Sequence, residues 1–202
     1  MRAKMLLLTG LLAAWTVMPR TASAVDLALV LLTDVSRSMD DAEYERVKAG
    51  YRAAFADPEV IAALLANGGG VAVAYVEFSG PNEFIVVKGW DLLTDAASAR
   101  TFGEAVAVAA RSSAGNTALA ASLRQATRML QDGGFGAARL VIDVASDHPT
   151  DGGRAAAVRD AAVAAGITIN ALPIVDDRPI GTFDGHMTYP SVQWGVGGMT
   201  EV

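Results

Sequence analysis

The sequence predicts one α/β domain built on an open, doubly wound sheet that is mostly parallel and has one antiparallel strand. Three observations predict it. Apolar runs of strand length alternate with segments of helical periodicity along most of the chain. Only Gly80-Pro81-Asn82 separates two of these runs, which predicts a hairpin and therefore an antiparallel pair. Helical segments separate the other runs, as they do in parallel sheets.

The first predicted strand covers residues 25–33, whose unbroken apolar run is typical of a strand buried on both faces. A helix is expected over residues 41–57, with Asp40 and Glu43 as a capping box at its start. Its core-facing stripe consists of Tyr44, Val47, Tyr51 and Phe55. A further short helix is expected from Pro58 to the glycines after Asn67.

The hairpin strands are expected over residues 71–79 and 83–90. Two helices follow over 95–111 and 117–132, and Gly133 and Gly134 end the second. The core stripe of that second helix consists of Leu119, Leu123, Ala126 and Leu130. The remaining expected elements are a strand over 138–145, a helix over 153–166 and a strand over 167–175.

Both ends of the chain differ from this pattern. Residues 1–24 have a basic start, an apolar middle and Ala22-Ser23-Ala24 at the end, which predicts a secretory signal cleaved after Ala24. A retained membrane anchor is the alternative, but the apolar stretch is short and Pro19-Arg20 interrupts it. Residues 176–202 lack periodicity and predict an irregular tail with one short strand near 186–194. The expected organisation is therefore signal 1–24, domain 25–175 and tail 176–202.

Charge and composition exclude some classes of partner and of binding site. Removing the signal takes away Arg2, Lys4 and Arg20 and leaves 13 basic against 22 acidic residues, a formal net charge of −9. This acidity argues against a nucleic-acid partner and fits a periplasmic or secreted protein with no membrane span after cleavage. The chain has no cysteine, so disulfides and thiolate metal sites are excluded.

Oxygen-bearing side chains follow three of the predicted elements at one edge of the sheet. Asp34, Ser36 and Ser38 alternate after the first strand, Thr117 opens a helix, and Asp147 follows the fourth strand. The carboxyl ends of strands in an open α/β sheet form its ligand-binding edge. Hydroxyl and carboxylate oxygens suit Mg²⁺, with Mn²⁺ or Ca²⁺ as alternatives, and do not favour zinc. The same residue types also cap helices and turns, which is the alternative explanation.

These three segments resemble the von Willebrand factor A domain, which carries a metal-ion-dependent adhesion site. "VDLALVLLTDVSRSMD", "VAVAYVEFSGP", "VIDVASD" and "AAVAAGITINALPI" are similar to a family of exported bacterial proteins of unknown function built on that domain. The resemblance implies that Ser36 and Ser38 bind the ion directly and that Thr117 does so in many ligand-bound forms. It implies that Asp34 and Asp147 lie close by, often acting through water. A carboxylate of a protein partner would complete the ion's shell, in a binding module without catalysis.

Two departures from that family leave alternatives open. His148 stands where glycine is usual after the last aspartate, where it could reach the open face of the ion, alter the shape of the loop or be an ordinary solvated histidine. A hydrolase with Ser36 or Ser38 as nucleophile, His148 as base and Asp147 as orienting group is one alternative function, although the chain has no G-x-S-x-G elbow. A metal-assisted hydrolase and a structural exported domain without metal are the others. The tail also does not resemble the sixth strand and final helix of the family, so the last strand and helix could be lacking, with a sheet edge and a helical slot uncovered.

Overall fold

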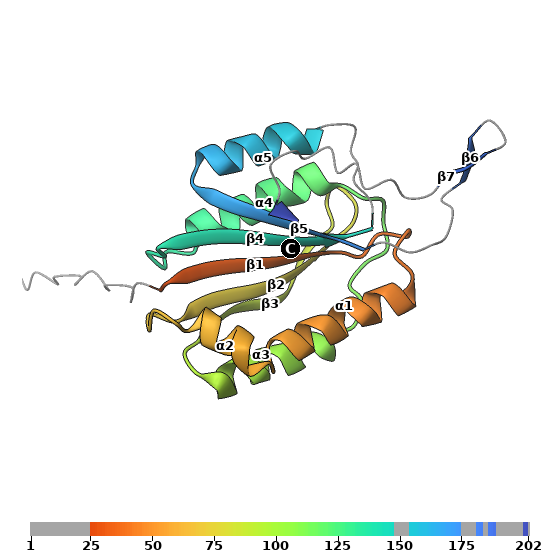
Figure 1. Ribbon diagram of the computed structural model, residues 1–202. Coiled ribbons are helices and arrows are strands. Elements are labelled where there is room, and N and C mark those ends of the chain that lie inside the picture. Colours follow the sequence, from red (N-terminus) through yellow and green to blue (C-terminus); the bar gives the residue numbers. More distant parts are fainter. Residues whose placement is uncertain (1–24, 148–153, 175–180, 184–185, 189–199, 202) are drawn as a thin grey trace, which may run out of the picture.

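A computed structural model describes residues 25–147, 154–174, 181–183, 186–188 and 200–201. Its main sheet has six strands in the order β3-β2-β1-β4-β5-β8, and β6 and β7 form a separate pair (Figure 1). The strands are Leu27–Asp34 (β1), Val71–Phe78 (β2), Phe84–Leu93 (β3), Arg139–Ser146 (β4), Ile167–Pro173 (β5), Gly181–Phe183 (β6), His186–Thr188 (β7) and Thr200–Glu201 (β8). The helices are Asp41–Ala54 (α1), Pro58–Leu64 (α2), Ala96–Ala107 (α3), Leu119–Asp132 (α4) and Arg154–Ala164 (α5).

Strand β1 lies at the centre of the sheet, parallel to β2 on one side and to β4 on the other. All eight of its residues are buried, which explains why its sequence is apolar without alternation. Strand β3 is antiparallel to β2, and β5 is parallel to β4. The predicted fold class is therefore confirmed, including its one antiparallel hairpin.

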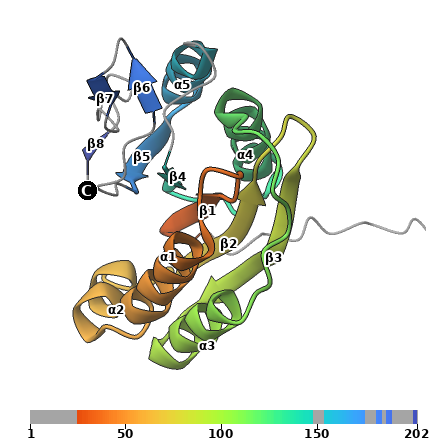
Figure 2. The same cartoon turned by 90° about the vertical axis from the view of Figure 1, so that its right-hand side faces the viewer.

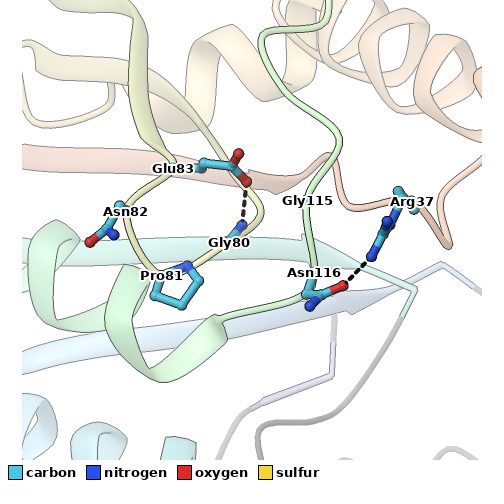
Figure 3. Close-up of a pocket in the computed structure, with 7 residues that line it drawn as sticks. All are labelled: Arg37, Gly80, Pro81, Asn82, Glu83, Gly115 and Asn116. Atoms are coloured by element: carbon cyan, nitrogen blue, oxygen red, sulfur yellow. Dashed lines mark hydrogen bonds between the residues drawn. The ribbon is translucent and has the colours of Figure 1, made fainter.

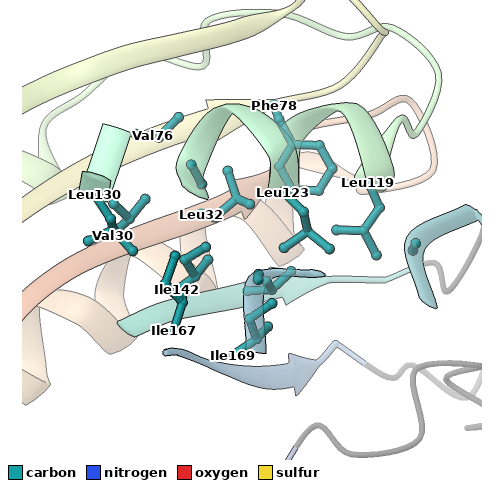
Figure 4. Close-up of a cluster of buried hydrophobic side chains, with 14 of the residues drawn as sticks. Val30, Leu32, Val76, Phe78, Leu119, Leu123, Leu130, Ile142, Ile167 and Ile169 are labelled. Atoms are coloured by element: carbon teal, nitrogen blue, oxygen red, sulfur yellow. The ribbon is translucent and has the colours of Figure 1, made fainter. Parts of the chain in front are cut away.

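Helices cover the sheet on both faces, with α1, α2 and α3 on one and α4 and α5 on the other (Figures 1 and 2). Under α4, Leu119, Leu123 and Ala126 are fully buried against apolar side chains of β1, β2 and β4 (Figure 4). This packing confirms the stripe predicted for that helix. Phe55 and Phe102 pack edge to face in the opposite core, with ring centroids 5.0 Å apart.

The capping box of α1 is present, because Glu43 N donates to Asp40 Oδ1 and Asp40 N donates to Glu43 Oε2, each at 2.8 Å. The predicted bounds of the next two long helices are wrong. Helix α3 ends at Ala107 and α4 begins at Leu119, so residues 108–118 form a non-helical crossing between them. The sequence already left 112–116 outside the helices, so the difference concerns residues 108–111 and 117–118, where contacts from other elements hold the crossing.

The part of the chain beyond β5 is described only in short pieces. β8 pairs with β5 over Asn170↔Thr200 and Ala171↔Glu201, at the sheet position of a sixth strand. The short strand expected near residues 186–194 corresponds to β7, although the remainder of that stretch, like the predicted signal 1–24, lies outside the described residues. Within the described parts, no helix is both long and apolar enough to cross a bilayer.

One stretch of the sheet carries no helix of the described chain. A mostly apolar groove of about 620 Å³ lies between α1, α2 and the strands β1, β4 and β5. Leu172 lines it and is 48% exposed, while Asp143 and Asn170 supply a polar pair on its floor. The sequence left an uncovered helical slot as one outcome, and the residues that could fill it, after β5, lie largely outside the described part of the chain.

Candidate metal centre

The candidate site residues meet at the carboxyl edge of the sheet, which Figure 2 views from in front. Asp34 ends β1, Ser36 and Ser38 lie in the turn after it, Thr117 precedes α4, and Asp147 follows β4. A continuous set of hydrogen bonds joins all of them, although Ser38 and Asp147 are 109 positions apart in the sequence. The convergence that the three-segment pattern predicts is therefore present in the fold.

Asp34 is the buried carboxylate beneath the serine turn. Its Oδ1 accepts from the backbone N–H of Ser36 at 2.8 Å and its Oδ2 accepts from Ser146 Oγ at 2.5 Å. The side chain is fully buried, and burial raises the pKa of Asp34 to about 6, while the bonds from Ser146 and Ser36 oppose that rise. Because its oxygens are already engaged, Asp34 is suited to orient the serine turn and to supply negative charge.

Three hydroxyls form a row above Asp34. Thr117 Oγ1 donates to Ser36 Oγ at 2.9 Å, Ser36 Oγ lies 3.0 Å from Ser38 Oγ, and Ser38 Oγ donates to Asp147 Oδ1 at 3.1 Å. Ser36 is buried, Ser38 is exposed, and Thr117 and Asp147 are half-buried. The row therefore passes from the buried Ser36 to the exposed Ser38 and ends on the half-buried carboxylate of Asp147.

The spacing of these oxygens tests which ion would fit. Mg²⁺ binds oxygen at about 2.0–2.1 Å in an octahedron, which places neighbouring ligands about 2.9 Å apart. Ca²⁺, at about 2.3–2.6 Å, would need neighbouring oxygens in an octahedron to stand about 3.3–3.7 Å apart. The 2.9 and 3.0 Å separations around Ser36 are compatible with the Mg²⁺ shell, but hydroxyls that bond to each other adopt the same distances without an ion, so the spacing does not single out Mg²⁺.

Arg111 holds the serine turn, and nothing in the sequence pattern indicated it. Its Nη2 donates to the carbonyls of Ser36 and Met39 at 2.7 Å each and to that of Val35 at 3.1 Å. Its Nη1 contacts the carboxylate of Asp41 at 3.2 Å. One guanidinium thus engages the main-chain carbonyls of the turn, while the side-chain hydroxyls of Ser36 and Ser38 bond to each other.

A buried polar cluster supports the segment that carries Arg111. Glu77, fully buried on β2, accepts from Tyr44 Oη at 2.7 Å, from Tyr75 Oη at 3.0 Å and from Ser112 N at 2.8 Å. Lys48 Nζ donates to the carbonyl of Ala109 at 2.8 Å. These contacts explain why residues 108–118 cross the sheet edge instead of continuing α3. Among the signals in the sequence, only the acid inside the apolar run 71–79 pointed to such a partner.

Other residues singled out in the sequence fall beside or outside the site. Asp40 caps α1, as expected. Asp143 accepts a hydrogen bond from Asn170 in the groove beside α1 and α2, away from the candidate site. His148 and Asp151 lie outside the described residues, so the role of His148 stays open. In the described chain no three acidic or histidine side chains cluster closely enough to hold a metal by themselves. The candidate centre depends on its hydroxyls.

Comparison with protein families gives a match over residues 24–190 to the family described as "Protein of unknown function (DUF1194)". The chain belongs to this family. The matched stretch of the DUF1194 chain includes every candidate site residue and extends beyond the predicted domain boundary at 175. No curated protein matches the sequence.

Solved structures show what fold the DUF1194 chain shares. Proximal thread matrix protein 1 from the mussel byssus, solved with a zinc-occupied MIDAS motif, is 15% identical with a TM-score of 0.57 over 76% of this chain and 39% of its own. BatB from Bacteroides thetaiotaomicron is 21% identical with a TM-score of 0.53, over 81% and 74% of the two chains. The pilus adhesin SpaC from Lactobacillus rhamnosus GG is 18% identical with a TM-score of 0.54, over 82% and 26%.

The DUF1194 chain spans about two fifths of the length of the mussel protein and a quarter of the adhesin. At these identities the likeness concerns the fold, and it confirms the predicted resemblance to von Willebrand factor A domains at that level. A bound metal is a property of the mussel protein structure.

Proposed function

We propose that this chain is an exported binding module that uses a divalent cation, Mg²⁺ by preference, to hold an acidic group of a protein partner. Ser36, Ser38 and Thr117 would bind the ion, and Asp34 and Asp147 would orient them and balance its charge. The observation that carries the proposal is the row of three hydroxyls at 2.9 and 3.0 Å spacing above a buried carboxylate. The predicted signal at 1–24 supports export to the periplasm or beyond.

The donor set explains why a carboxylate is the expected partner group. Three hydroxyls would fill only half of the shell of a hard divalent ion that takes six oxygen ligands. The two carboxylates would balance its charge from close by without filling the remaining positions. The bound ion supplies a positive charge with an open coordination position at the surface end of the row. Ser38 is exposed at that end, so a partner can reach it.

A binding role also fits the hydrogen bonds of the two serines better than a nucleophilic one. Ser36 Oγ bonds to other hydroxyls and Ser38 Oγ donates directly to a carboxylate, and neither bonds to an imidazole in the described chain. The base proposed for a serine hydrolase, His148, lies outside the described residues. No described contact therefore favours catalysis.

Thermal unfolding tests the site directly. The purified protein is unfolded in EDTA and then with increasing Mg²⁺ or Mn²⁺. A ligand that binds only the folded state stabilises it by about 2.7 kcal/mol at one hundred times its Kd, so the melting temperature rises with concentration. We expect this rise in the wild type and its loss in Asp34→Asn, which removes the charge and keeps the side-chain shape.

Asp26→Asn is the matched control, because Asp26 precedes β1 at the opposite end from Asp34 and also accepts a backbone N–H, from Gly69 at 2.7 Å. It should respond to metal as the wild type does. Thr117→Val is a second test that leaves the buried carboxylate untouched. If Asp34→Asn and Thr117→Val both gain stability from Mg²⁺ as the wild type does, the ion does not bind here.

A further inference from the structure

A hollow of about 320 Å³ lies beside the candidate metal centre, between the β2–β3 turn and the segment that precedes α4 (Figure 3). Its lining consists of Arg37, Gly80, Pro81, Asn82, Glu83, Gly115 and Asn116. Nothing in the proposed ion binding requires this hollow. Its position and its charges indicate what kind of partner segment it can receive.

The hollow shares its rim with the ion site. Arg37 is the residue between Ser36 and Ser38, and Asn116 directly precedes Thr117. The backbone N–H of Arg37 donates to the carbonyl of Gly115 at 3.0 Å, which fastens the two segments together. An acidic group bound at the hydroxyls would therefore lie close to Arg37.

Arg37 is an exposed cation, and in the described part of the chain its guanidinium donates to one side-chain oxygen. Its Nη2 donates to Asn116 Oδ1 at 2.5 Å, and no carboxylate of the described chain forms an ion pair with it. A guanidinium has five N–H donors in a planar fork that suits a carboxylate. Since the protein is acidic overall, with a formal net charge of −6, this cation is a local exception at the binding edge.

Glu83 places a negative charge on the wall of the hollow that lies across from Arg37. Its Oε2 accepts from Ser79 Oγ at 2.5 Å and from Gly80 N at 2.8 Å, and these bonds lower the pKa of Glu83, so it stays ionised. Gly115 lets this carboxylate approach, because a Cβ there would lie 2.0 Å from Glu83 Oε2. An anion is favoured near Arg37 and repelled at the far wall.

We propose that Arg37 binds a second acidic side chain of the partner, next to the one held at the ion. The preferred ligand is then a peptide segment with two neighbouring acidic residues. A longer acidic run should bind no more tightly, because the negative charge of Glu83 repels a third acidic side chain. This inference rests on the proposed function, since the first acidic group is placed by the ion.

The test uses capped peptides with one glutamate, with two adjacent glutamates, or with two glutamates separated by one residue. Binding to the Mg²⁺-loaded protein is measured by calorimetry. We expect the better two-acid peptide to bind about fivefold more tightly than the one-acid peptide, a difference of about 1 kcal/mol. Arg37→Gln, which can still donate to Asn116, should remove that preference and leave one-acid binding in place. Asn82→Ala, an uncharged change in the same lining, should keep the preference.

The outcomes distinguish a failure of the Arg37 contact from a failure of the proposed metal-dependent binding. If the wild type binds all three peptides equally, or if the preference survives in Arg37→Gln, Arg37 is not a partner contact although the ion site stands. If no peptide binds in a Mg²⁺-dependent way, the adhesion function fails and this inference fails with it.

Discussion

At the scale of single residues, the candidate centre depends on a side chain that is not expected to touch the ion. Arg111 donates to the carbonyls of Val35, Ser36 and Met39 and so ties together three main-chain positions of the serine turn. Hydrogen bonds from a charged donor are among the stronger ones in proteins. Arg111 is therefore a positioning residue for the serine turn.

Arg111→Lys should weaken Mn²⁺ binding about tenfold, which corresponds to about 1.4 kcal/mol. Lysine keeps the positive charge but lacks the planar fork that reaches several carbonyls together, so the loss reports geometry and not charge. Affinity is measured by electron paramagnetic resonance titration of the folded protein. Arg52→Lys, which alters the exposed pair of Arg52 with Glu104, is the control and should bind as the wild type does. Equal affinity in Arg111→Lys would remove the positioning role.

At the scale of elements, the β4–β5 pair carries a half-buried acid, Asp143, within a mostly apolar groove. Asp143 stands opposite Asn170 in the register and accepts from its Nδ2 at 2.7 Å. Burial raises the pKa of Asp143 above its ordinary 3.8, while Asn170 and the more distant Arg139 oppose the rise. Tyr51, Arg46 and Glu43 also line the groove. Burial, together with the charge of Asp143, raises the pKa of Tyr51 to about 12.

The raised pKa of Asp143 determines how this residue makes the stability of the protein depend on pH. A carboxyl with a raised pKa in the folded state keeps its proton longer than in the unfolded chain. Its contribution to stability is full below pH 3.8 and is lost as pH rises through the folded pKa. Asp143→Asn should therefore stabilise the protein at pH 7 and have a smaller effect at pH 4, as measured by urea unfolding. A difference independent of pH, or a less stable variant at pH 7, would contradict this account.

At the scale of the whole molecule, the candidate centre exists only when the sheet is assembled. Ser36 and Thr117 are 81 positions apart, and Ser38 and Asp147 are 109 apart, yet one row of hydrogen bonds joins them. Strands β1 and β4 bring their carboxyl ends to the same edge because they are parallel neighbours. Binding at this edge is thus linked to global folding.

Hydrogen exchange should show this linkage. Mg²⁺ should slow exchange together in peptides that cover residues 34–40 and 112–118, because one ion would bind both segments. Helix α2, which contributes nothing to the candidate centre, should exchange at the same rate with and without the ion. Protection confined to one of the two segments would contradict a shared centre.

The sequence by itself determined the central strand, the hairpin, the helical stripes and the identity of the candidate oxygen ligands. These follow from local rules, since burial sets the apolar run of β1 and helical periodicity sets the stripe of α4. The order of elements along a parallel sheet then brings the three ligand segments to one edge.

Tertiary structure alone decided where α3 ends, which cation holds the serine turn, and that a charged hollow adjoins the candidate centre. Glu77 and Lys48 stop the helix through contacts with Ser112 and Ala109, and Arg111 reaches carbonyls more than 70 positions away. No local pattern encodes such contacts, because a charged side chain looks the same in sequence whether it faces solvent or a distant backbone carbonyl. The free energy that fixes them arises only when both partners are brought together by the fold.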